Sequence, residues 1–196
     1  LAYTLGRDDR PADVALLRPG KTPLKLTDLN GDLMGQRQMT RAERITWPSS
    51  HDAMMIEGWV MKPPGFDPAK TYPMILEIHG GPHSAYGPNY STEAQLFAAA
   101  GYVVLYTNPR GSTSYGEQFA NEIDLAYPGF DYDDLISGVD ALIDQGYVDP
   151  EQLFDTGGSG GGVLTAWIVG KTDRFRAAVV AKPVINWASF VLTADR

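Results

Sequence analysis

The chain has 196 residues, 43% hydrophobic and 20% charged, so it has enough apolar side chains to bury a core and lacks the composition of a disordered segment. Its net charge of −8 arises after Tyr72, where six Lys and Arg face fifteen Asp and Glu. An acidic body argues against nucleic acid and anionic membrane as partners, because both attract basic surfaces. The absence of cysteine excludes disulfides, thiolate metal sites and a cysteine nucleophile.

No apolar run approaches the length that crosses a membrane, and no signal peptide opens the sequence. These features favour a cytoplasmic protein. The chain starts at Leu1 rather than at a methionine, so a missing upstream targeting segment stays open. We expect neither a metal nor a cofactor.

Residues 1–42 alternate short β-like runs, of which 12–17 is the clearest, with turn signals such as Asn30-Gly31. This segment is too short to bury a core of its own. It is therefore interpreted as the end of a larger all-β unit upstream. Two strands, 43–47 and 54–61, follow and are joined as a hairpin by a polar turn.

From Met74 onward, apolar strands alternate with helices. This alternation predicts an α/β fold with a mostly parallel sheet that is covered by helices on both faces. The expected strands are 74–79, 102–107, 153–156 and 176–181, with Asp149-Pro150-Glu151 as a turn before the third, and the expected helices are 91–100, 115–123, 131–145 and one that starts after the glycine run at 157–162.

Gly157, Ser159 and Gly161 match the pattern G-x-S-x-G, which forms a nucleophile elbow between a strand and a helix. Glycines suit this turn because the strained chain leaves little room for β-carbons beside the serine. A flexible linker has a similar composition, but it would lie among polar residues. Here the apolar runs 153–154 and 163–169 flank the glycines, which favours the elbow.

Two further glycine-containing segments, Gly80-Gly81 and Arg110-Gly111, also follow strands. Ligands of open parallel sheets bind beyond the carboxyl ends of the strands, so the three segments are expected to converge on one site. A nucleophilic serine needs donors for the oxyanion that forms. The backbone N–H of Gly160 is one expected donor, and the Gly80-Gly81 region supplies the other.

A serine nucleophile also needs a base, usually a histidine that a carboxylate orients. The histidines His51, His79 and His83 all precede Ser159, whereas this fold class places the acid and then the base after the serine. His51 is interpreted as an exposed loop residue, His79 as support for the oxyanion loop, and His83 as loop structure or a substrate contact. Asp173 and Asp195, the acids after Ser159, are interpreted as surface or capping residues.

Three segments together resemble the signatures of the prolyl oligopeptidase family of serine peptidases, in particular its acylaminoacyl-peptidase and dipeptidyl-peptidase branch. The resemblance runs from about Glu43 to the end, and the segments that carry it are His79-Gly80-Gly81-Pro82-His83-Ser84, residues 108–116 and residues 157–162. It implies an α/β-hydrolase catalytic domain, of which residues 43–196 would be the N-terminal two-thirds. It also implies that residues 1–42 are the end of a β-propeller and a linker.

The resemblance implies roles for individual residues. Ser159 would be the nucleophile, Gly81 and Gly160 would form the oxyanion hole, and Arg110 would brace the loop beside the site. The segment 182–190 is similar to the stretch that lines the pocket for the residue before the cleaved bond. Its members Val184, Trp187 and Phe190 would be pocket walls, although large apolar side chains such as these also fill cores.

Two departures from the family pattern stand out. Gly160 replaces the tyrosine or similar residue that usually follows the serine, which is expected to loosen the turn. The family's Asp and His would lie past residue 196, on the remainder of the protein or on another chain. The favoured function is hydrolysis of short peptides, with N-blocked and free N-termini both left open; the alternatives are an esterase of the same fold or a catalytically incomplete fragment or remnant. The sequence leaves open whether the protein forms a homo-oligomer.

The missing base generates a prediction about the chain by itself. A protein that ends at Arg196 should show negligible hydrolase activity, because no histidine follows Ser159. Turnover of peptide and ester substrates by the isolated chain and by its Ser159→Ala variant is the measurement. Hydrolysis that disappears on Ser159→Ala would contradict the prediction.

Overall fold

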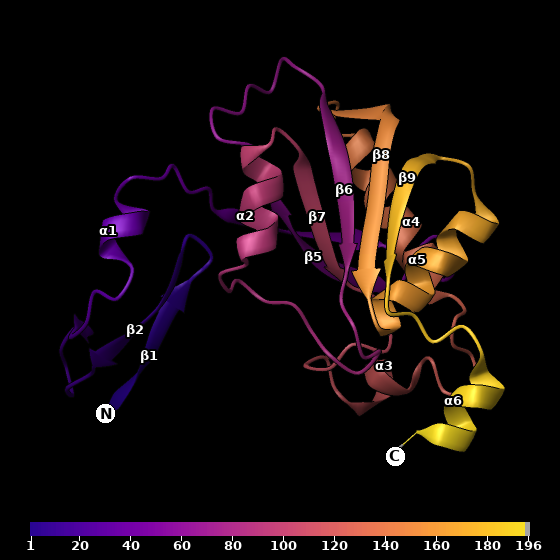
Figure 1. Cartoon of the computed structure of the whole chain (residues 1–196), viewed down its shortest axis with the longest axis horizontal. Helices are drawn as coiled ribbons and strands as arrows, with labels where there is room; N and C mark the ends of the chain where they lie inside the picture. Colours follow the sequence, from indigo (N-terminus) through magenta and orange to yellow (C-terminus); the bar gives the residue numbers. More distant parts are fainter. Residues whose placement is uncertain (195–196) are drawn as a thin grey trace.

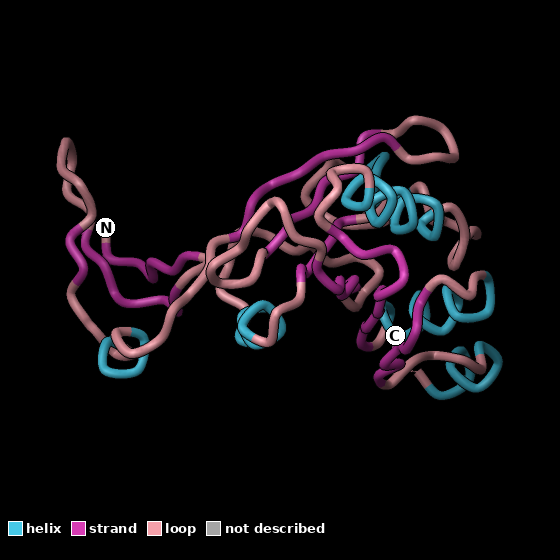
Figure 2. The backbone as a smooth tube through the Cα atoms, turned by 90° about the horizontal axis from the view of Figure 1, so that it is seen from above, coloured by secondary structure: helices cyan, strands magenta, loops and turns pink. Residues whose placement is uncertain are grey.

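The computed structural model describes residues 1–194 and divides them between a small N-terminal unit and a larger domain built on one sheet. Figure 1 and Figure 2 show the N-terminal unit at one end of the molecule, joined to the larger domain by an extended connection. Asp195 lies outside the described residues. No helix among residues 1–194 is long and apolar enough to cross a membrane.

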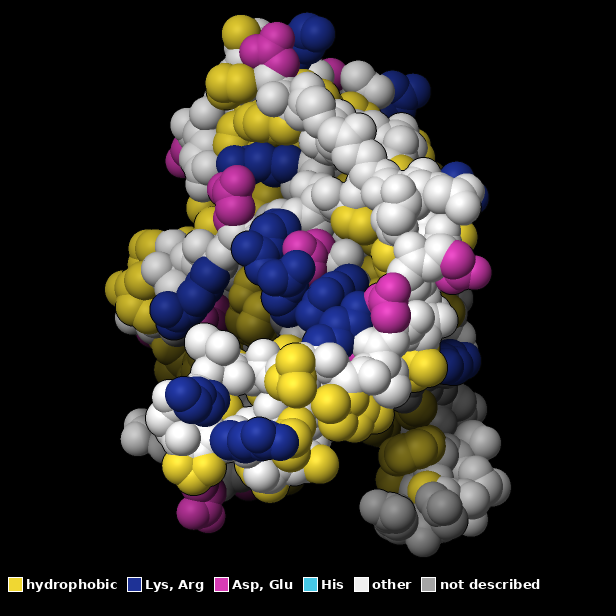
Figure 3. All heavy atoms as spheres, turned by 90° about the vertical axis from the view of Figure 1, so that its left-hand side faces the viewer, with side chains coloured by type: hydrophobic (Ala, Val, Ile, Leu, Met, Phe, Trp, Pro, Cys, Tyr) yellow, Lys and Arg dark blue, Asp and Glu magenta, His cyan; other side chains and the backbone are white. Residues whose placement is uncertain are grey.

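The N-terminal unit is a three-stranded antiparallel sheet, β1 (Ala2–Arg7), β2 (Arg10–Leu16) and β3 (Leu24–Lys25), followed by the short helix α1 (Gly31–Met34). The strand expected at 12–17 is β2. In Figure 3, which faces this end of the molecule, Lys and Arg side chains gather with Asp and Glu among them. Arg7 pairs with Asp9 at 2.9 Å and Lys25 with Asp13 at 3.0 Å, so part of this positive charge is neutralised. That the unit belongs to a propeller stays a prediction.

The larger domain is built on a six-stranded sheet in the order β4-β5-β7-β6-β8-β9. The first two strands form the predicted hairpin and pair antiparallel, and β5 is also antiparallel to β7, whereas the remaining neighbours run parallel. The strands are β4 (Ala42–Pro48), β5 (Met55–Met61), β6 (Tyr72–Ile78), β7 (Val103–Asn108), β8 (Val148–Gly158) and β9 (Phe175–Ala181).

One strand boundary differs from the prediction. The turn expected at Asp149-Pro150-Glu151 lies inside β8, which already starts at Val148. Val148 pairs with Tyr72 and Leu153 with Met74, so the intervening residues of β8 outnumber those of β6 and bulge outward. The Asp149 carboxylate accepts a hydrogen bond from the N–H of Glu151 at 2.9 Å, which is the local turn that the sequence indicated.

Five helices accompany the sheet: α2 (Thr92–Ala99), α3 (Glu117–Asn121), α4 (Asp131–Ile143), α5 (Gly160–Lys171) and α6 (Trp187–Thr193). The N-cap of α2 is Ser91, whose hydroxyl accepts a hydrogen bond from the N–H of Ala94 at 3.1 Å. Figure 1 shows α3 and α6 below the carboxyl ends of the parallel strands, where the predicted site lies.

Both faces of the sheet are packed, which explains the continuous apolar strands. On β7, Val103 and Leu105 pack into a cluster with residues of α4 and α5, whereas Val104 and Tyr106 pack with Ala94 and Ala98 of α2. Successive side chains of a strand point to opposite faces, so α2 covers one face while α4 and α5 cover the other. Because both faces are covered, side chains that contact a ligand are expected at the carboxyl ends of the strands.

The strand β9 forms one border of the sheet and pairs only with β8 within residues 1–194. Val179 on this strand is 64% exposed and Val180 is 38% exposed. An apolar border strand of this kind invites further pairing. The strand β9 therefore leaves an exposed apolar border of the sheet within the described residues.

Asp155 is an unusual residue in the centre of β8. Its side chain is 1% exposed, next to Leu76 in the pairing register, and neither carboxylate oxygen finds a hydrogen-bond partner within residues 1–194. Burial raises the pKa of Asp155 to about 7. The folded state therefore binds a proton that the unfolded state releases near pH 4, and this group makes the protein less stable as pH rises from about 4 to about 7.

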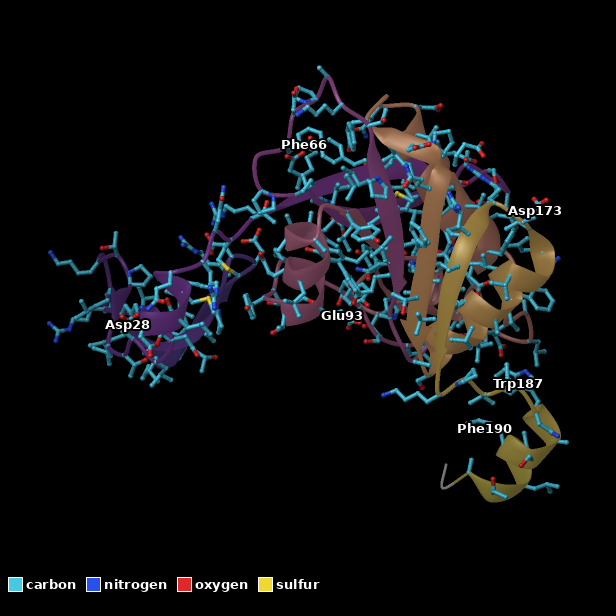
Figure 4. All side chains as sticks on the ribbon, turned by 45° about the horizontal axis from the view of Figure 1, so that its top comes forward. Asp28, Phe66, Glu93, Asp173, Trp187 and Phe190 are labelled. Carbon is cyan, nitrogen blue, oxygen red and sulfur yellow. The ribbon has the colours of Figure 1, made fainter. Side chains whose placement is uncertain are left out.

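Replacing Asp155 should remove this penalty. Asp155→Val is expected to raise stability at pH 8 by about 2–4 kcal/mol and to have a much smaller effect at pH 5, where the buried acid is protonated. Thermal unfolding midpoints of wild type and variant at the two pH values are the measurement. Asp173→Val is the control, because Asp173 is exposed at the opposite end of β9 from Trp187 (Figure 4). An equal change at both pH values would contradict the prediction.

Candidate active site

Ser159 lies at the sharp junction of β8 and α5, with φ 59° and ψ −116°. A positive φ at a residue other than glycine is strained and persists only where the surroundings hold it. Here the N–H of Ser159 donates to the carbonyl of Ala181 at the end of β9, at 3.0 Å, and the carbonyl of Ser159 accepts from the N–H of Val163 at 3.0 Å. Ser159 therefore has the backbone geometry of a nucleophile elbow.

The glycines around Ser159 are required by packing. A β-carbon on Gly157 would lie 2.5 Å from the backbone of Gly161, and one on Gly161 would lie 2.1 Å from the carbonyl oxygen of Ile78. A β-carbon on Gly162 would lie 2.5 Å from the carbonyl oxygen of Ala181. The start of α5 is thus pressed against the ends of β6 and β9, which explains why the run is a turn and not a linker.

The loop after β6 also approaches the elbow. Gly81 has φ +130°, and a β-carbon on Gly80 would lie 3.0 Å from the carbonyl oxygen of Gly158. Among the hydrogen bonds of the described residues, the N–H groups of Gly81 and Gly160 donate to no acceptor. Two unused donors on adjacent backbones are what an oxyanion hole requires.

Gly160 does not leave an empty space beside the serine. A β-carbon at this position would lie 2.9 Å from the carbonyl carbon and oxygen of Gly81 and 3.0 Å from its nitrogen. The room that a side chain would need is filled by the backbone of Gly81, while the expected loosening of the turn stays a prediction. The two prospective donors lie close together for this reason.

Two histidines hold the surrounding loops. His79 is 8% exposed, and its Nδ1–H donates to the carbonyl of Gly80 at 2.7 Å, while Nε2 lies 3.0 Å from the hydroxyl of Ser112. Burial lowers the pKa of His79, so the ring is neutral near pH 7. His83 donates from Nδ1 to the carbonyl of Gly111 at 3.0 Å. Both rings thus tie the oxyanion loop to residues 111–112, while His51 is exposed and stacks on Phe130.

Arg110 braces the neighbouring loop through buried carboxylates. Its side chain is 2% exposed, and it donates to both carboxylate oxygens of Asp134, at 2.8 and 2.9 Å, and to Asp52 at 3.1 Å. Burial opposes the charge of Arg110, but the hydrogen bonds to Asp134 and Asp52 outweigh it and raise the pKa. A permanently charged Arg110 therefore joins the β4–β5 turn to α4, directly before Gly111 and Ser112.

The three residues that the resemblance placed in a pocket wall have different positions. Trp187 lines a cavity of about 560 Å³ together with Pro82 and His83 of the oxyanion loop. Phe190 packs edge-on against Trp187 with ring centroids 5.8 Å apart, and Val184 is partly buried, but neither lines that cavity. Trp187 and Phe190 are each 43% exposed (Figure 4), so they are not core residues within the described chain.

Sequence reasoning did not identify Glu77. This residue and Tyr86 line a second cavity of about 440 Å³, which also includes Ser159 and Lys182. Burial raises the pKa of Glu77 to about 7, although the hydroxyl of Tyr86 donates to its carboxylate at 3.0 Å. The signal that could have revealed it is a single acid within the apolar strand 74–78.

Sequence reasoning also missed Tyr127, which lies in the segment between α3 and α4. Its hydroxyl donates to the carbonyl oxygen of Gly160 at 2.7 Å. Its ring lines the same cavity as Trp187. Nothing in the loop sequence marks this residue, because the contact depends entirely on how the loop folds over the elbow.

The site lacks a base within the described residues. None of the three histidines donates to or accepts from the Ser159 hydroxyl, and the exposed Asp173 lies away from it. No group of three or more His, Asp or Glu among residues 1–194 could hold a metal ion. The chain thus presents a strained serine and two backbone donors without the groups that would activate the hydroxyl.

Comparison with known proteins agrees with this geometry. The model of the prolyl oligopeptidase family matches residues 88–196, more than half of the chain. The chain belongs to this family. An uncharacterized peptidase of Bacillus subtilis, YuxL, is 43% identical over 190 residues, which are 96% of this chain and 29% of the relative. Dipeptidyl-peptidase 5 of Schizosaccharomyces pombe is 37% identical over 152 residues, 75% of this chain and 22% of the relative.

A solved acylaminoacyl peptidase in complex with Z-Gly-Gly-Phe-chloromethyl ketone superposes with a TM-score of 0.88 and 30% identity, covering 96% of this chain and 30% of that one. The larger domain of this prolyl oligopeptidase family member is accordingly part of an α/β-hydrolase fold. The chain spans less than a third of the length of each of these three proteins. In the fold, β6 carries the oxyanion loop and β8 carries the elbow.

The close contact between Gly160 and Gly81 yields a prediction for the longer protein. Gly160→Ala is expected to displace the oxyanion loop and to slow labelling of Ser159 by a fluorophosphonate at least tenfold, since the new β-carbon meets backbone atoms at 2.9 Å. Gly170→Ala, in the same helix, is the control because a β-carbon there meets no atom within 4 Å. Equal labelling rates for wild type and Gly160→Ala would contradict the prediction.

Proposed function

We propose that the chain is part of a serine peptidase that hydrolyses short peptides through an acyl-enzyme formed on Ser159. The observation that supports this most strongly is the strained Ser159 at φ 59° beside two backbone N–H groups without acceptors. An acyl transfer needs these features, and a binding module has no use for them. Membership of the prolyl oligopeptidase family supports the same reaction.

In the proposed mechanism, the Oγ of Ser159 attacks the carbonyl carbon of the scissile amide. A histidine from outside this chain takes the hydroxyl proton, and an aspartate orients that histidine. The carbonyl oxygen becomes an oxyanion that accepts hydrogen bonds from the N–H groups of Gly81 and Gly160. Collapse of this intermediate breaks the C–N bond and passes the proton to the leaving amine. Water then attacks the acyl-enzyme ester by the same steps, which releases the carboxylic acid product and restores the Ser159 hydroxyl.

The substrate class follows from the cavity beside the oxyanion loop. Trp187 presents an aromatic ring there, and Phe190 backs that ring. We propose that Trp187 contacts a large apolar side chain before the cleaved bond, and that Phe190 and Val184, which do not line this cavity, join the same pocket wall in the longer protein. The phenylalanine-containing ketone bound to the similar acylaminoacyl peptidase supports this preference. Substrates would be N-blocked short peptides or, as in the dipeptidyl peptidases, peptides cleaved after two residues.

We also propose that residues 1–42 are the end of an upstream β-propeller that limits substrate size. The three-stranded antiparallel sheet of the N-terminal unit supports this proposal. The Asp and His of the catalytic triad would come from the remainder of the protein.

The test uses a protein extended past residue 196 and fluorophosphonate labelling followed by peptide mass spectrometry. Ser159 should be labelled, and Ser159→Ala should lower kcat for N-blocked phenylalanine amides by on the order of 10⁴ or more. Thr165→Ala, in the same helix but distant from the elbow, is expected to keep most of the activity. Absence of labelling in a folded, extended protein would overturn the proposal.

A further inference from the structure

Tyr127 connects the two parts of the site that bind different portions of a substrate. At one end its hydroxyl donates to the carbonyl of Gly160, at 2.7 Å. At the other end its ring packs edge-on against Trp187, with centroids 6.3 Å apart and planes at 88°. One side chain thus contacts both the elbow and the expected wall of the specificity pocket.

The hydroxyl contact matters because the start of α5 has little stiffness of its own. Gly160, Gly161 and Gly162 follow the nucleophile in succession, and glycine is the residue with the most backbone freedom. The carbonyl that Tyr127 binds belongs to Gly160, whose own N–H is an expected oxyanion donor. The carbonyl and the N–H of Gly160 belong to adjacent peptide units that share one Cα atom, so anchoring the carbonyl limits how far this Cα, and with it the N–H, can move.

The segment that carries Tyr127 is itself anchored. Asp131, which is 1% exposed, accepts hydrogen bonds from the N–H groups of Gly129 at 2.8 Å and Tyr132 at 2.9 Å. These bonds hold the loop at the point where it enters α4. Tyr127 can therefore act as a fixed support, whereas a side chain on a free loop could not.

The hydroxyl of Tyr127 remains a donor at every pH at which a peptidase works. Burial, and next the charge of Asp131, raise the pKa of Tyr127 above its ordinary value. The phenol is therefore neutral, and its hydrogen bond to Gly160 does not titrate. Any pH dependence of the reaction therefore arises from groups other than Tyr127.

We infer that Tyr127 is a positioning residue for acyl transfer, which holds the Gly160 oxyanion donor through its hydroxyl and orients the Trp187 pocket wall through its ring. The inference rests on the proposed function. The two contacts of Tyr127 are expected to have different effects. The hydroxyl acts on the reaction step, and the ring acts on recognition of the residue before the cleaved bond. The two effects are measurable as kcat and KM.

The decisive variant is Tyr127→Phe in the protein extended past residue 196. We expect kcat for an N-blocked phenylalanine amide to fall by about 2- to 10-fold, which corresponds to the loss of one neutral hydrogen bond, with KM unchanged. The rate of labelling by a small fluorophosphonate, which leaves the pocket empty, should fall by the same factor. Tyr127→Leu should add a rise in KM for phenylalanine substrates but not for alanine substrates.

Tyr147→Phe is the matched control, because Tyr147 also donates one hydrogen bond from its hydroxyl, to Gln145 at 2.9 Å, before β8 begins. Thermal unfolding and active-site titration of each variant give its folded, active fraction. A kcat of Tyr127→Phe equal to wild type overturns the inference. So does a fall in kcat that the loss of active fraction explains in full, since that is a merely structural role.

If Tyr127→Phe does not fold, Trp187→Leu tests the other end of the bridge. It should raise KM for phenylalanine substrates and leave fluorophosphonate labelling unchanged; slower labelling would contradict the separation of roles. Failure of the proposed function has a different signature. In that case, the wild-type protein itself shows no turnover that depends on Ser159.

Discussion

The close packing of backbone against backbone at the elbow is the constraint on which the rest of this structure depends. The start of α5 lies so near the ends of β6 and β9 that β-carbons on Gly161 and Gly162 would lie 2.1 and 2.5 Å from carbonyl oxygens. This close packing holds Ser159 at φ 59°, and Ser159 is exposed at the carboxyl end of β8. It also places Gly160 against Gly81, so that the same packing forms the turn at Ser159 and brings the two unused N–H groups near each other.

The outer contacts of the site serve this arrangement. The rings of His79 and His83 tie the oxyanion loop to residues 111–112, and Arg110 connects that second loop to α4 through the buried Asp134. Tyr127 reaches the elbow from the segment before α4. Backbone packing fixes the position of the glycines, and side chains from neighbouring loops add further support to the same geometry.

Two buried acids in the sheet respond to pH in the same range but with different consequences. Asp155 faces the side of the sheet covered by α4 and α5 and lacks a hydrogen-bond partner within residues 1–194, so its ionisation acts on stability. Glu77 lies beside the cavity that includes Ser159, and its carboxylate accepts from Tyr86. Burial raises the pKa of both to about 7, so the two carboxyl groups ionise in the same pH range.

The sequence by itself determined the alternation of strands and helices from β4 to β9, the elbow and the position of Ser159, because these depend on local patterns: apolar periodicity, capping at Ser91 and glycine spacing. It did not indicate the helices α1 and α6. Tertiary structure alone decided which side chains meet across the site. The contacts of Tyr127 with Gly160 and of Arg110 with Asp134 join residues 33 and 24 positions apart, and no local propensity encodes them. The burial of Asp155 and Glu77 could not be predicted from the sequence either, because each is simply a polar residue in a strand. Packing on both faces of the sheet buries the two carboxyl groups and raises their pKa values.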